Sequence, residues 1–340
     1  MHTCERPGLP NSSAKRMTTA DVAREAGVSR ATVSYVLNET PHQRISETTR
    51  RKVLDVAARL GYEPSAAARV LRRGRSDLVV AVLPDYSIGP TFTEFLRELA
   101  TALHRYRLTL MVHPKPKGVG DIRHLWQAVS PGAAIRLDSV HDDAEAYEHL
   151  QIPTAQVVYA RQEGDGLLMV VPNEEFGQAQ VGALAERGYR RLAYAYPANP
   201  VLVVCAEPRL AGVRTACEQL GLEPPVVSTV SIDLGSAKEA IAAWLDHGVT
   251  AVCAYNDEVA LVLLQAARQM GVDVPGELAV IGVDDLPGAA MATPSLATVT
   301  LDVAPLADEV ARRLAAVMDH AEPCPPVAEG IFEVVVRASI

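Results

Sequence analysis

Three polar side chains, Arg209, Asn256 and Asp284, stand where an open α/β sheet would place ligand-binding groups. Asn256 follows the apolar run TAVCAY, Asp284 follows LAVIGV, and Arg209 opens the helix predicted after a third strand. Ligands of such sheets bind at the carboxyl ends of the strands. A guanidinium, an amide and a carboxylate there suit forked hydrogen bonds to vicinal hydroxyls or to a carboxylate. A helix-capping role is an equal alternative for Asn256, and Asp257 and Asp285 are better interpreted as a helix cap and a loop-closing carboxylate.

A second set of side chains, along residues 30–38, is suited to contact with DNA. Its outward positions are small or hydrogen-bonding and include no acid: Arg30, Ala31, Ser34, Tyr35 and Asn38. An arginine fork can pair with guanine O6 and N7, a tyrosine can offer its hydroxyl or ring, and an alanine can make only apolar contact. Ser34, Asn38 and Arg51 suit phosphate contacts, which set register without reading sequence. A solvated helix face is an equal alternative for Arg51, and a small helical bundle without DNA is the alternative for the whole segment.

Three short helices are predicted to position this second set. Thr18 and Asp21 form a variant capping box for a helix over 18–26 that ends at Gly27. Ser29 then offers a cap for a second helix, and Ser46 offers one for a third that ends at Gly61. Their apolar positions can share one core: Val33, Val36, Leu37, Val53, Val56, Ala57 and Leu60. Helix, glycine-containing turn and helix is the layout in which the second helix enters the DNA major groove.

From Leu78 onward, short β-branched runs alternate with amphipathic stretches, which predicts βαβ units around parallel sheets. One group of strands is expected at 78–83, 108–113, 133–137 and 154–158, and a second at 191–196, 250–255 and 278–283. Helices are expected at 91–105, 121–129, 174–187, 207–220, 236–247, 257–270 and 303–319. Continuous apolar runs are what parallel strands covered on both faces require.

Charge divides the chain into a basic head and an acidic body. Residues 1–76 hold 14 basic against 7 acidic side chains, and the remaining residues hold 18 against 34. The overall charge of −9 therefore does not exclude nucleic acid as a partner. No apolar stretch approaches the roughly 20 residues of a membrane span, and the N-terminus lacks the apolar region of a signal peptide. We expect a soluble, cytoplasmic protein.

Catalytic and metal-binding patterns are missing from the sequence. There is no G-x-S-x-G, Walker A loop, G-x-G-x-x-G after a strand or H-E-x-x-H, and the nine histidines are scattered. The five cysteines have no C-x-x-C spacing, so buried reduced thiols are expected rather than disulfides or a zinc site. We therefore predict no enzymatic activity, no cofactor and no metal.

The head resembles the LacI/GalR family of bacterial transcription regulators. The motifs that carry the resemblance are D-V-A-x-x-A-G-V-S at 21–29, T-V-S-x-V-L-N at 32–38, I-S-E-x-T-R at 45–50, G-Y-x-P at 61–64 and R-S at 75–76. In the body, similar motifs are G-Y-R-R at 188–191, R-L-A-G at 209–212, A-Y-N-D-E-V-A-L at 254–261, V-I-G-V-D-D at 280–285 and V-V-V-R-A-S at 334–339. Residues 84–150 match the family poorly.

For the head, the resemblance implies base contacts by Arg30, Ala31 and Tyr35. It also implies that residues 64–76 form a hinge helix that folds on operator DNA and inserts Leu71 into the minor groove, with Arg72 and its basic neighbours on flanking phosphates. A flexible linker is the alternative. The DNA-contacting residues are then expected to be Thr18, Arg30, Ala31, Thr32, Ser34, Tyr35, Asn38, Arg51, Leu71 and Arg72.

For the body, the resemblance implies a two-lobed fold like that of periplasmic sugar-binding proteins, with the effector in the cleft between the lobes. Arg209, Asn256 and Asp284 align with effector-contacting residues of the family. Where the family often has a sugar-stacking aromatic after Asp233, this chain has Leu234. Tyr86 or Phe92 could stack instead, although core packing is the favoured role of Phe92. The expected effector-binding residues are Tyr86, Asn173, Arg209, Leu234, Asn256 and Asp284.

These observations predict an α/β chain with four parts: a disordered extension over 1–16, a three-helix helix-turn-helix domain over 17–63, a hinge over 64–76 and an effector-binding domain over 77–340. The first lobe is expected over about 77–158 and 289–320, and the second over about 159–288 and 321–340. The leading hypothesis is a homodimeric repressor that reads a palindromic operator under control of a polar effector such as a sugar. The alternatives are a transport-type solute-binding protein and an enzyme that uses the cleft.

Overall fold

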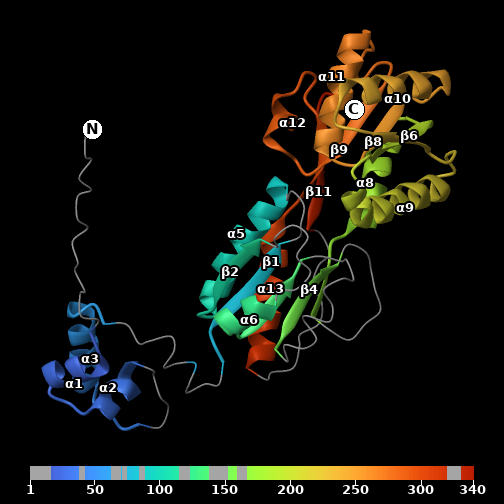
Figure 1. The fold of residues 1–340 in the computed structure, drawn as a ribbon. Helices are drawn as coiled ribbons and strands as arrows, with labels where there is room; N and C mark the ends of the chain where they lie inside the picture. Colours follow the sequence, from blue (N-terminus) through green and yellow to red (C-terminus); the bar gives the residue numbers. More distant parts are fainter. Residues whose placement is uncertain are drawn as a thin grey trace, which may run out of the picture. The chain divides into compact units, whose positions relative to one another are not determined.

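The computed structural model describes residues 17–37, 43–62, 70, 75–83, 89–114, 123–137, 152–158, 167–319 and 331–340. The chain divides into two compact units, Met1–Ser76 and Asp77–Ile340 (Figure 1). The predicted extension over 1–16, most of the predicted hinge, and the site residues Asn38, Leu71, Arg72 and Tyr86 lie outside the described residues. No helix in the described part of the chain is both long and apolar enough to cross a membrane.

The N-terminal unit contains three helices around one small core. They are α1 (Thr19–Ala26), α2 (Arg30–Leu37) and α3 (Glu47–Arg59). Thr18 and Asp21 form the predicted capping box, Gly27 ends α1 in the left-handed conformation with φ 66°, and Ser46 caps α3. The core residues come from all three helices: Val22, Ala23, Ala26, Val33, Val36, Val53, Val56 and Ala57. The predicted three-helix head is confirmed.

The first sheet of the C-terminal unit has five parallel strands in the order β2-β1-β3-β4-β5. The strands are β1 (Leu78–Leu83), β2 (Thr109–Pro114), β3 (Ala133–Arg136), β4 (Thr154–Val158) and β5 (Leu167–Val170). The helices that cover it are α5 (Pro90–Arg105), α6 (Arg123–Val129) and α13 (Val303–Met318). Helices α5 and α13 share one apolar cluster with the sheet, whereas Leu125 and Trp126 of α6 belong to another. The sheet is therefore buried on both faces, as its apolar strands predict.

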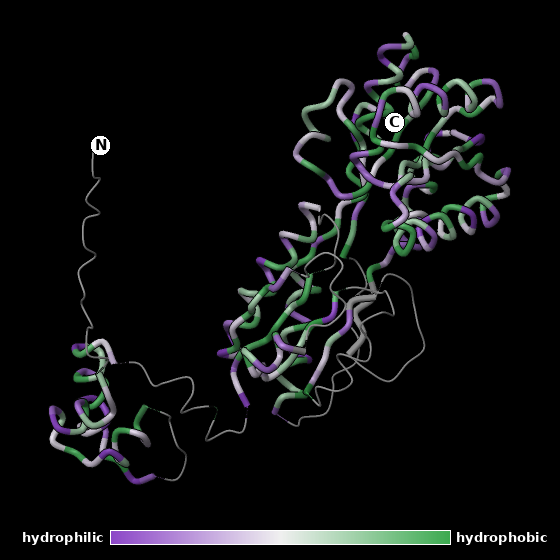
Figure 2. The backbone as a smooth tube through the Cα atoms, in the orientation of Figure 1, coloured by the Kyte–Doolittle hydropathy of each residue, from purple (hydrophilic) through white to green (hydrophobic). Residues whose placement is uncertain are grey.

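The second sheet has six strands in the order β11-β10-β9-β8-β6-β7, and only β10 and β11 pair antiparallel. The strands are β6 (Leu192–Pro197), β7 (Val226–Val230), β8 (Ala251–Ala254), β9 (Ala279–Val283), β10 (Ala297–Leu301) and β11 (Phe332–Val335). Helices α8 (Asn173–Glu186) and α9 (Val203–Gln219) pack against each other beside this sheet, as do α10 (Leu234–Asp246) and α11 (Asp257–Met270). Two short helical elements also belong to this part of the chain, η2 (Pro200–Leu202) and α12 (Pro287–Met291). Along these helices apolar and polar residues alternate (Figure 2).

The predicted lobe boundaries were wrong in two places. Residues 167–170 form β5 of the first sheet because they pair in parallel with β4, whereas the sequence assigned them to the second lobe. Residues 297–301 form β10 of the second sheet because they pair with β9, whereas the sequence assigned them to the first lobe. Of the predicted 289–320 segment, α13 packs with the first sheet, together with Leu301 at the end of β10. The strands β5, β7 and β10 were not among the predicted strands.

Candidate functional site

Helix α2 presents the surface that the sequence predicts for DNA. The hydroxyl of Ser29 accepts a hydrogen bond from the backbone N–H of Thr32 at 3.0 Å, as predicted for the helix cap. Val33 and Val36 turn into the core, which leaves Arg30, Ala31 and Tyr35 exposed. The arrangement brings a cation, a methyl group and a phenol to one outward face, where they can reach base edges.

Two further predicted DNA residues have local partners instead. The Thr18 hydroxyl donates to the Asp21 carboxylate at 2.7 Å, and the Thr32 hydroxyl lies 2.9 Å from that of Ser29. Bonds with Thr18 and the neighbouring Arg24 lower the pKa of Asp21 to about 2. Ser34 is half-buried on α2, and Arg51 is exposed on α3. Thr18 and Thr32 therefore shape the helix starts, whatever else they contact.

In the C-terminal unit, the candidate effector site lies at the carboxyl ends of β6, β8 and β9. The connections from β6 run to β7 on one side and, further along the chain, to β8 on the other, so the strand order reverses there. Open α/β sheets bind ligands at this switch point. Asn256 follows β8 and Asp284 follows β9, as predicted. Arg209 does not open its helix, because η2 precedes α9 and moves the helix start to Val203.

Arg209 is the buried centre of this site, with only 5% of its surface exposed. Its guanidinium donates to the Asn173 side-chain oxygen at 2.8 Å and to the Tyr255 carbonyl. It also lies over two rings, 4.7 Å from the centroid of Tyr255 and 5.3 Å from that of Phe176. Its Nε has no hydrogen-bond partner among the described residues. A buried donor without an acceptor costs about 1–3 kcal/mol, so this atom is suited to an incoming acceptor.

Asp284 supplies a carboxylate, a hydrogen-bond acceptor, beside the arginine donor. Its backbone has φ 113°, a conformation that non-glycine residues rarely adopt and that clusters at functional sites. Burial raises the pKa of its carboxyl to about 6, Arg209 lowers it and Glu258 raises it. Within the described chain no hydrogen bond reaches this carboxylate, although the backbone N–H of Asp284 donates to Val299 at 2.8 Å. A buried arginine donor and a strained acceptor carboxylate therefore act on one another electrostatically.

The other predicted effector residues are placed differently. Asn173 begins α8 and is 1% exposed, where it holds Arg209. Asn256 is the N-cap of α11, since its side-chain oxygen accepts from Val259 N–H at 3.1 Å. The prediction that Asp257 is the cap was therefore wrong, and the capping alternative for Asn256 describes its side chain. Leu234 packs against the core of the second sheet.

Two glycines let α8 and α9 approach closely enough to form the Asn173–Arg209 pair. A Cβ on Gly177 would lie 2.1 Å from the carbonyl oxygen of Arg209, and one on Gly212 would lie 1.9 Å from that of Glu174. The two contacts are reciprocal, one in each direction across the helix crossing. Only glycine fits such a backbone approach.

Sequence reasoning missed several residues that complete the site. Gln180 is fully buried on α8 and donates to carbonyls at the ends of β8 and β9: Ala254 at 2.8 Å, and Ile281 and Gly282 at 3.2 Å. Cys205, one turn before Arg209, packs against the apolar clusters of both sheets. The signal available in the sequence was the spacing of Asn173, Phe176 and Gln180, which puts a polar residue on the buried face of a helix.

Comparisons with known proteins agree with both units. The family model for bacterial regulatory proteins of the lacI family matches residues 18–65, and that for a periplasmic binding protein-like domain matches 181–340. The chain is 32% identical to the HTH-type transcriptional regulator MalR of Streptomyces coelicolor over 348 residues, which covers 95% of this chain and 97% of that protein. It is 30% identical to the HTH-type transcriptional regulator DegA of Bacillus subtilis over 296 residues, covering 84% and 86%.

Solved structures show the same fold. A lac repressor dimer bound to operator and the anti-inducer ONPF has a TM-score of 0.75 at 23% identity, covering 96% of this chain and 99% of that one. A complex of the transcriptional regulator CelR with cellobiose has a TM-score of 0.67 at 25% identity, covering 95% and 100%. Together these matches favour a DNA-binding regulator over a transport-type solute-binding protein.

Proposed function

The chain belongs to the LacI/GalR family of bacterial transcription regulators, and on that premise we propose that it is a repressor whose hold on operator DNA is controlled by a small polar effector. The head over 17–63 reads a palindromic operator as half of a homodimer. Residues 64–76 act as the hinge, and residues 77–340 bind the effector. Two-fold symmetry of the operator then mirrors that of the protein.

In this proposal Arg30, Ala31 and Tyr35 read bases, because α2 leaves these three exposed while its other face is buried. Ser34, Asn38 and Arg51 hold phosphates. The basic head supplies most of the salt-dependent affinity, since the acidic body repels the backbone of DNA. Leu71, flanked by Arg72, is the residue we assign to the minor groove.

The observation that carries the effector half is that, among the described residues, the Nε of Arg209 has no acceptor and the carboxylate of Asp284, on which Arg209 acts electrostatically, has no donor. One group needs an acceptor and the other needs a donor. Adjacent hydroxyls of a polyol or sugar supply both at once. The cellobiose complex of CelR supports this class of ligand. Leu234 offers no ring for stacking, so hydrogen bonds dominate recognition here.

The test combines ligand screening with DNA binding by the full-length protein. Cellobiose, maltose, ribose and galactose are added in turn, and a ligand is recognised by a raised unfolding temperature. The same ligand is then titrated against a fluorescent operator complex. We expect Asp284→Asn, which keeps the shape of the side chain, to abolish the ligand response and preserve operator affinity.

A matched control is Asp233→Asn, which changes a carboxylate that caps α10 through Ser236 N–H at 2.9 Å. It should respond to ligand as the wild type does. If Asp284→Asn still responds at wild-type concentrations of ligand, the assigned site is wrong. If the protein binds to no DNA fragment that contains its own promoter region, the regulatory proposal is wrong.

A further inference from the structure

The turn that carries Asp284 is strained at two successive residues. Asp284 has φ 113° and Asp285 has φ 50°, and both values lie in the region that favours glycine. Such a conformation persists only where surrounding groups determine it. The contacts that hold this turn therefore decide where the Asp284 carboxylate points.

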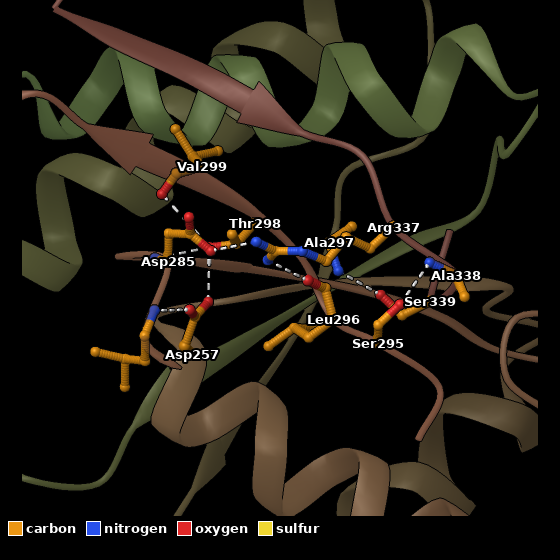
Figure 3. A network of polar contacts seen from close by, with 11 residues as sticks. Asp257, Asp285, Ser295, Leu296, Ala297, Thr298, Val299, Arg337, Ala338 and Ser339 are labelled. Atoms are coloured by element: carbon orange, nitrogen blue, oxygen red, sulfur yellow. Dashed lines mark hydrogen bonds and ion pairs between the residues drawn. The ribbon is translucent and has the colours of Figure 1, made fainter. Parts of the chain in front are cut away.

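Two fully buried side chains from other elements make those contacts (Figure 3). Asp257, the first residue of α11, accepts from the backbone N–H of Leu286 at 2.8 Å and from the Thr298 hydroxyl at 2.7 Å. The same hydroxyl, on β10, accepts from the backbone N–H of Asp285 at 3.3 Å. The two N–H groups that follow Asp284 are thus both held by one connected pair.

The surrounding backbone is built around this pair. A Cβ on Gly282 would lie 2.0 Å from the Asp257 side-chain oxygen, so the carboxylate reaches across β9 where only glycine leaves room. Beyond the turn, Asp285 pairs with Arg337 at 2.6 Å, and Arg337 also donates to the Leu296 carbonyl at 2.8 Å. The Asp285 carboxylate is therefore held by Arg337.

We propose that Asp257 and Thr298 are positioning residues that hold the strained turn so that Asp284 faces the effector. Neither side chain contacts the effector. The proposal rests on the assignment of Asp284 to the effector site. It predicts that a change at Thr298 alters effector affinity out of proportion to its effect on folding.

The electrostatics of the pair give it a pH signature. Burial raises the pKa of Asp257 to about 7, the bonds from Thr298 and Leu286 lower it, and the charges of Asp284 and Asp285 raise it. The charged groups around the turn are Arg337, which pairs with Asp285, and Arg209 and Glu258, which act on Asp284. When Asp257 takes up a proton, one of its two accepting oxygens becomes a donor. Because these two bonds favour the charged carboxylate, the turn should loosen locally as pH falls below about 7 while Asp257 stays buried; global unfolding, which exposes Asp257 to water, responds to pH in the opposite direction.

The experiment compares Thr298→Val, which removes the hydroxyl at equal size, with Thr298→Ser, which keeps it. Ile241→Val is the stability control, since Ile241 is buried in α10 and takes no part in the hydrogen bonds that hold this turn. Hydrogen exchange of residues 283–288 and cellobiose affinity are measured on the full-length proteins, alongside urea unfolding. In Thr298→Val we expect at least tenfold faster exchange of this segment and at least tenfold weaker cellobiose binding. Thr298→Ser should stay within threefold of the wild type.

Hydrogen exchange measured over a series of pH values distinguishes the proposed role from a purely structural one. After correction for intrinsic exchange rates, segment 283–288 of the wild type should lose protection between pH 8 and pH 6. Asp257→Asn should show no such change.

Three outcomes would overturn the proposal. One is equal exchange and affinity in Thr298→Val and the wild type, and another is the same loss in Ile241→Val. The third is unaltered pH dependence in Asp257→Asn. If the wild type binds none of the sugars tested, the sugar class proposed for the effector fails, and the exchange and pH results alone decide on the positioning pair.

Discussion

The crossing of α8 and α9 offers a sharp test of how the proposed effector site is built. Adding one methyl group through Gly212→Ala places a Cβ 1.9 Å from the Glu174 carbonyl oxygen, 2.6 Å from its carbon and 2.8 Å from its Cα. All three atoms are backbone, so no side-chain rotation can relieve the clash. To reach ordinary contact near 3.4 Å the helices must separate by roughly 1.5 Å.

That separation has two measurable consequences. Overpacking of this kind destabilises a protein by about 1–3 kcal/mol, and a clash between two helix backbones belongs at the upper end of that range. The Arg209–Asn173 hydrogen bond of 2.8 Å spans the same crossing and should be broken. Effector affinity should therefore fall together with stability.

Gly182→Ala is the matched control on α8, the other helix of the crossing. A Cβ on Gly182 meets nothing within 4 Å, so only the helix propensity changes. Alanine should stabilise this position by about 0.5–1 kcal/mol. Urea unfolding followed by circular dichroism measures both variants. The reasoning is refuted if Gly212→Ala is as stable as the wild type, or if both alanine variants shift stability in the same direction.

Three further predictions concern the head and the buried acid. Arg30→Ala should remove discrimination at one operator base pair, on the order of 1–3 kcal/mol, while binding to random DNA changes little; anisotropy titrations over single-base operator variants check this, and a uniform loss on every sequence would contradict it. Thr18→Ala removes the capping box of α1 and should lower the stability of the head by about 1 kcal/mol, whereas Thr101→Ala on α5 should leave the head unchanged. The pKa of Asp257 is raised to about 7, so the folded state binds the Asp257 proton more tightly than the unfolded state does. Protonation of Asp257 therefore adds to the free energy of unfolding, most strongly below about pH 4, and this addition is lost as pH rises to about 7. Asp257→Asn should flatten this slope, which for one group is at most about 1.4 kcal/mol per pH unit, in urea unfolding at pH 5, 6 and 7; an unchanged slope would show that other groups cause it.

The head could be predicted closely because its signals are local. Each helix start depends on a side chain three residues from its backbone partner: Thr18 with Asp21, Ser29 with Thr32 and Ser46 with Thr49. Such caps are visible in a short stretch of sequence. The exposed face of α2 then follows from the positions of its buried valines.

The body could be predicted only as far as its strands and helices carry their own pattern. The strands with continuous apolar runs and α11 were found, whereas β7 and β10 mix polar residues into their apolar pattern and were missed together with β5. The start of α9 was misplaced because Pro200 begins a 3₁₀ turn that continues into the helix. Pairing between strands distant in the chain, which assigns β5 and β10 to their sheets, leaves no local signal.

The chemistry of the effector site is the least local part. Arg209 bonds to groups 36 and 46 residues away, and Asp257 to Thr298 across 41 residues. Sequence position identified Asp284 as an acceptor at a strand end, but not the strain in its backbone. It also could not distinguish Asn256 as a cap from Asn256 as a ligand, because both roles require the same residue at the same place.

The proposed position of the effector at Arg209 meets one requirement for control of the DNA-binding head. Affinity alone shifts no equilibrium, since a ligand must bind one arrangement of the protein better than the other. Cys205, one turn before Arg209, packs against the apolar clusters of both sheets. Val171 likewise packs against the cluster of the first sheet and against the cluster that contains Phe176 of α8. An effector that takes the free Nε of Arg209 is therefore bound beside residues that belong to two cores at once. Any rearrangement of one sheet against the other changes the surroundings of that bond, which gives the effector different affinities for the two arrangements.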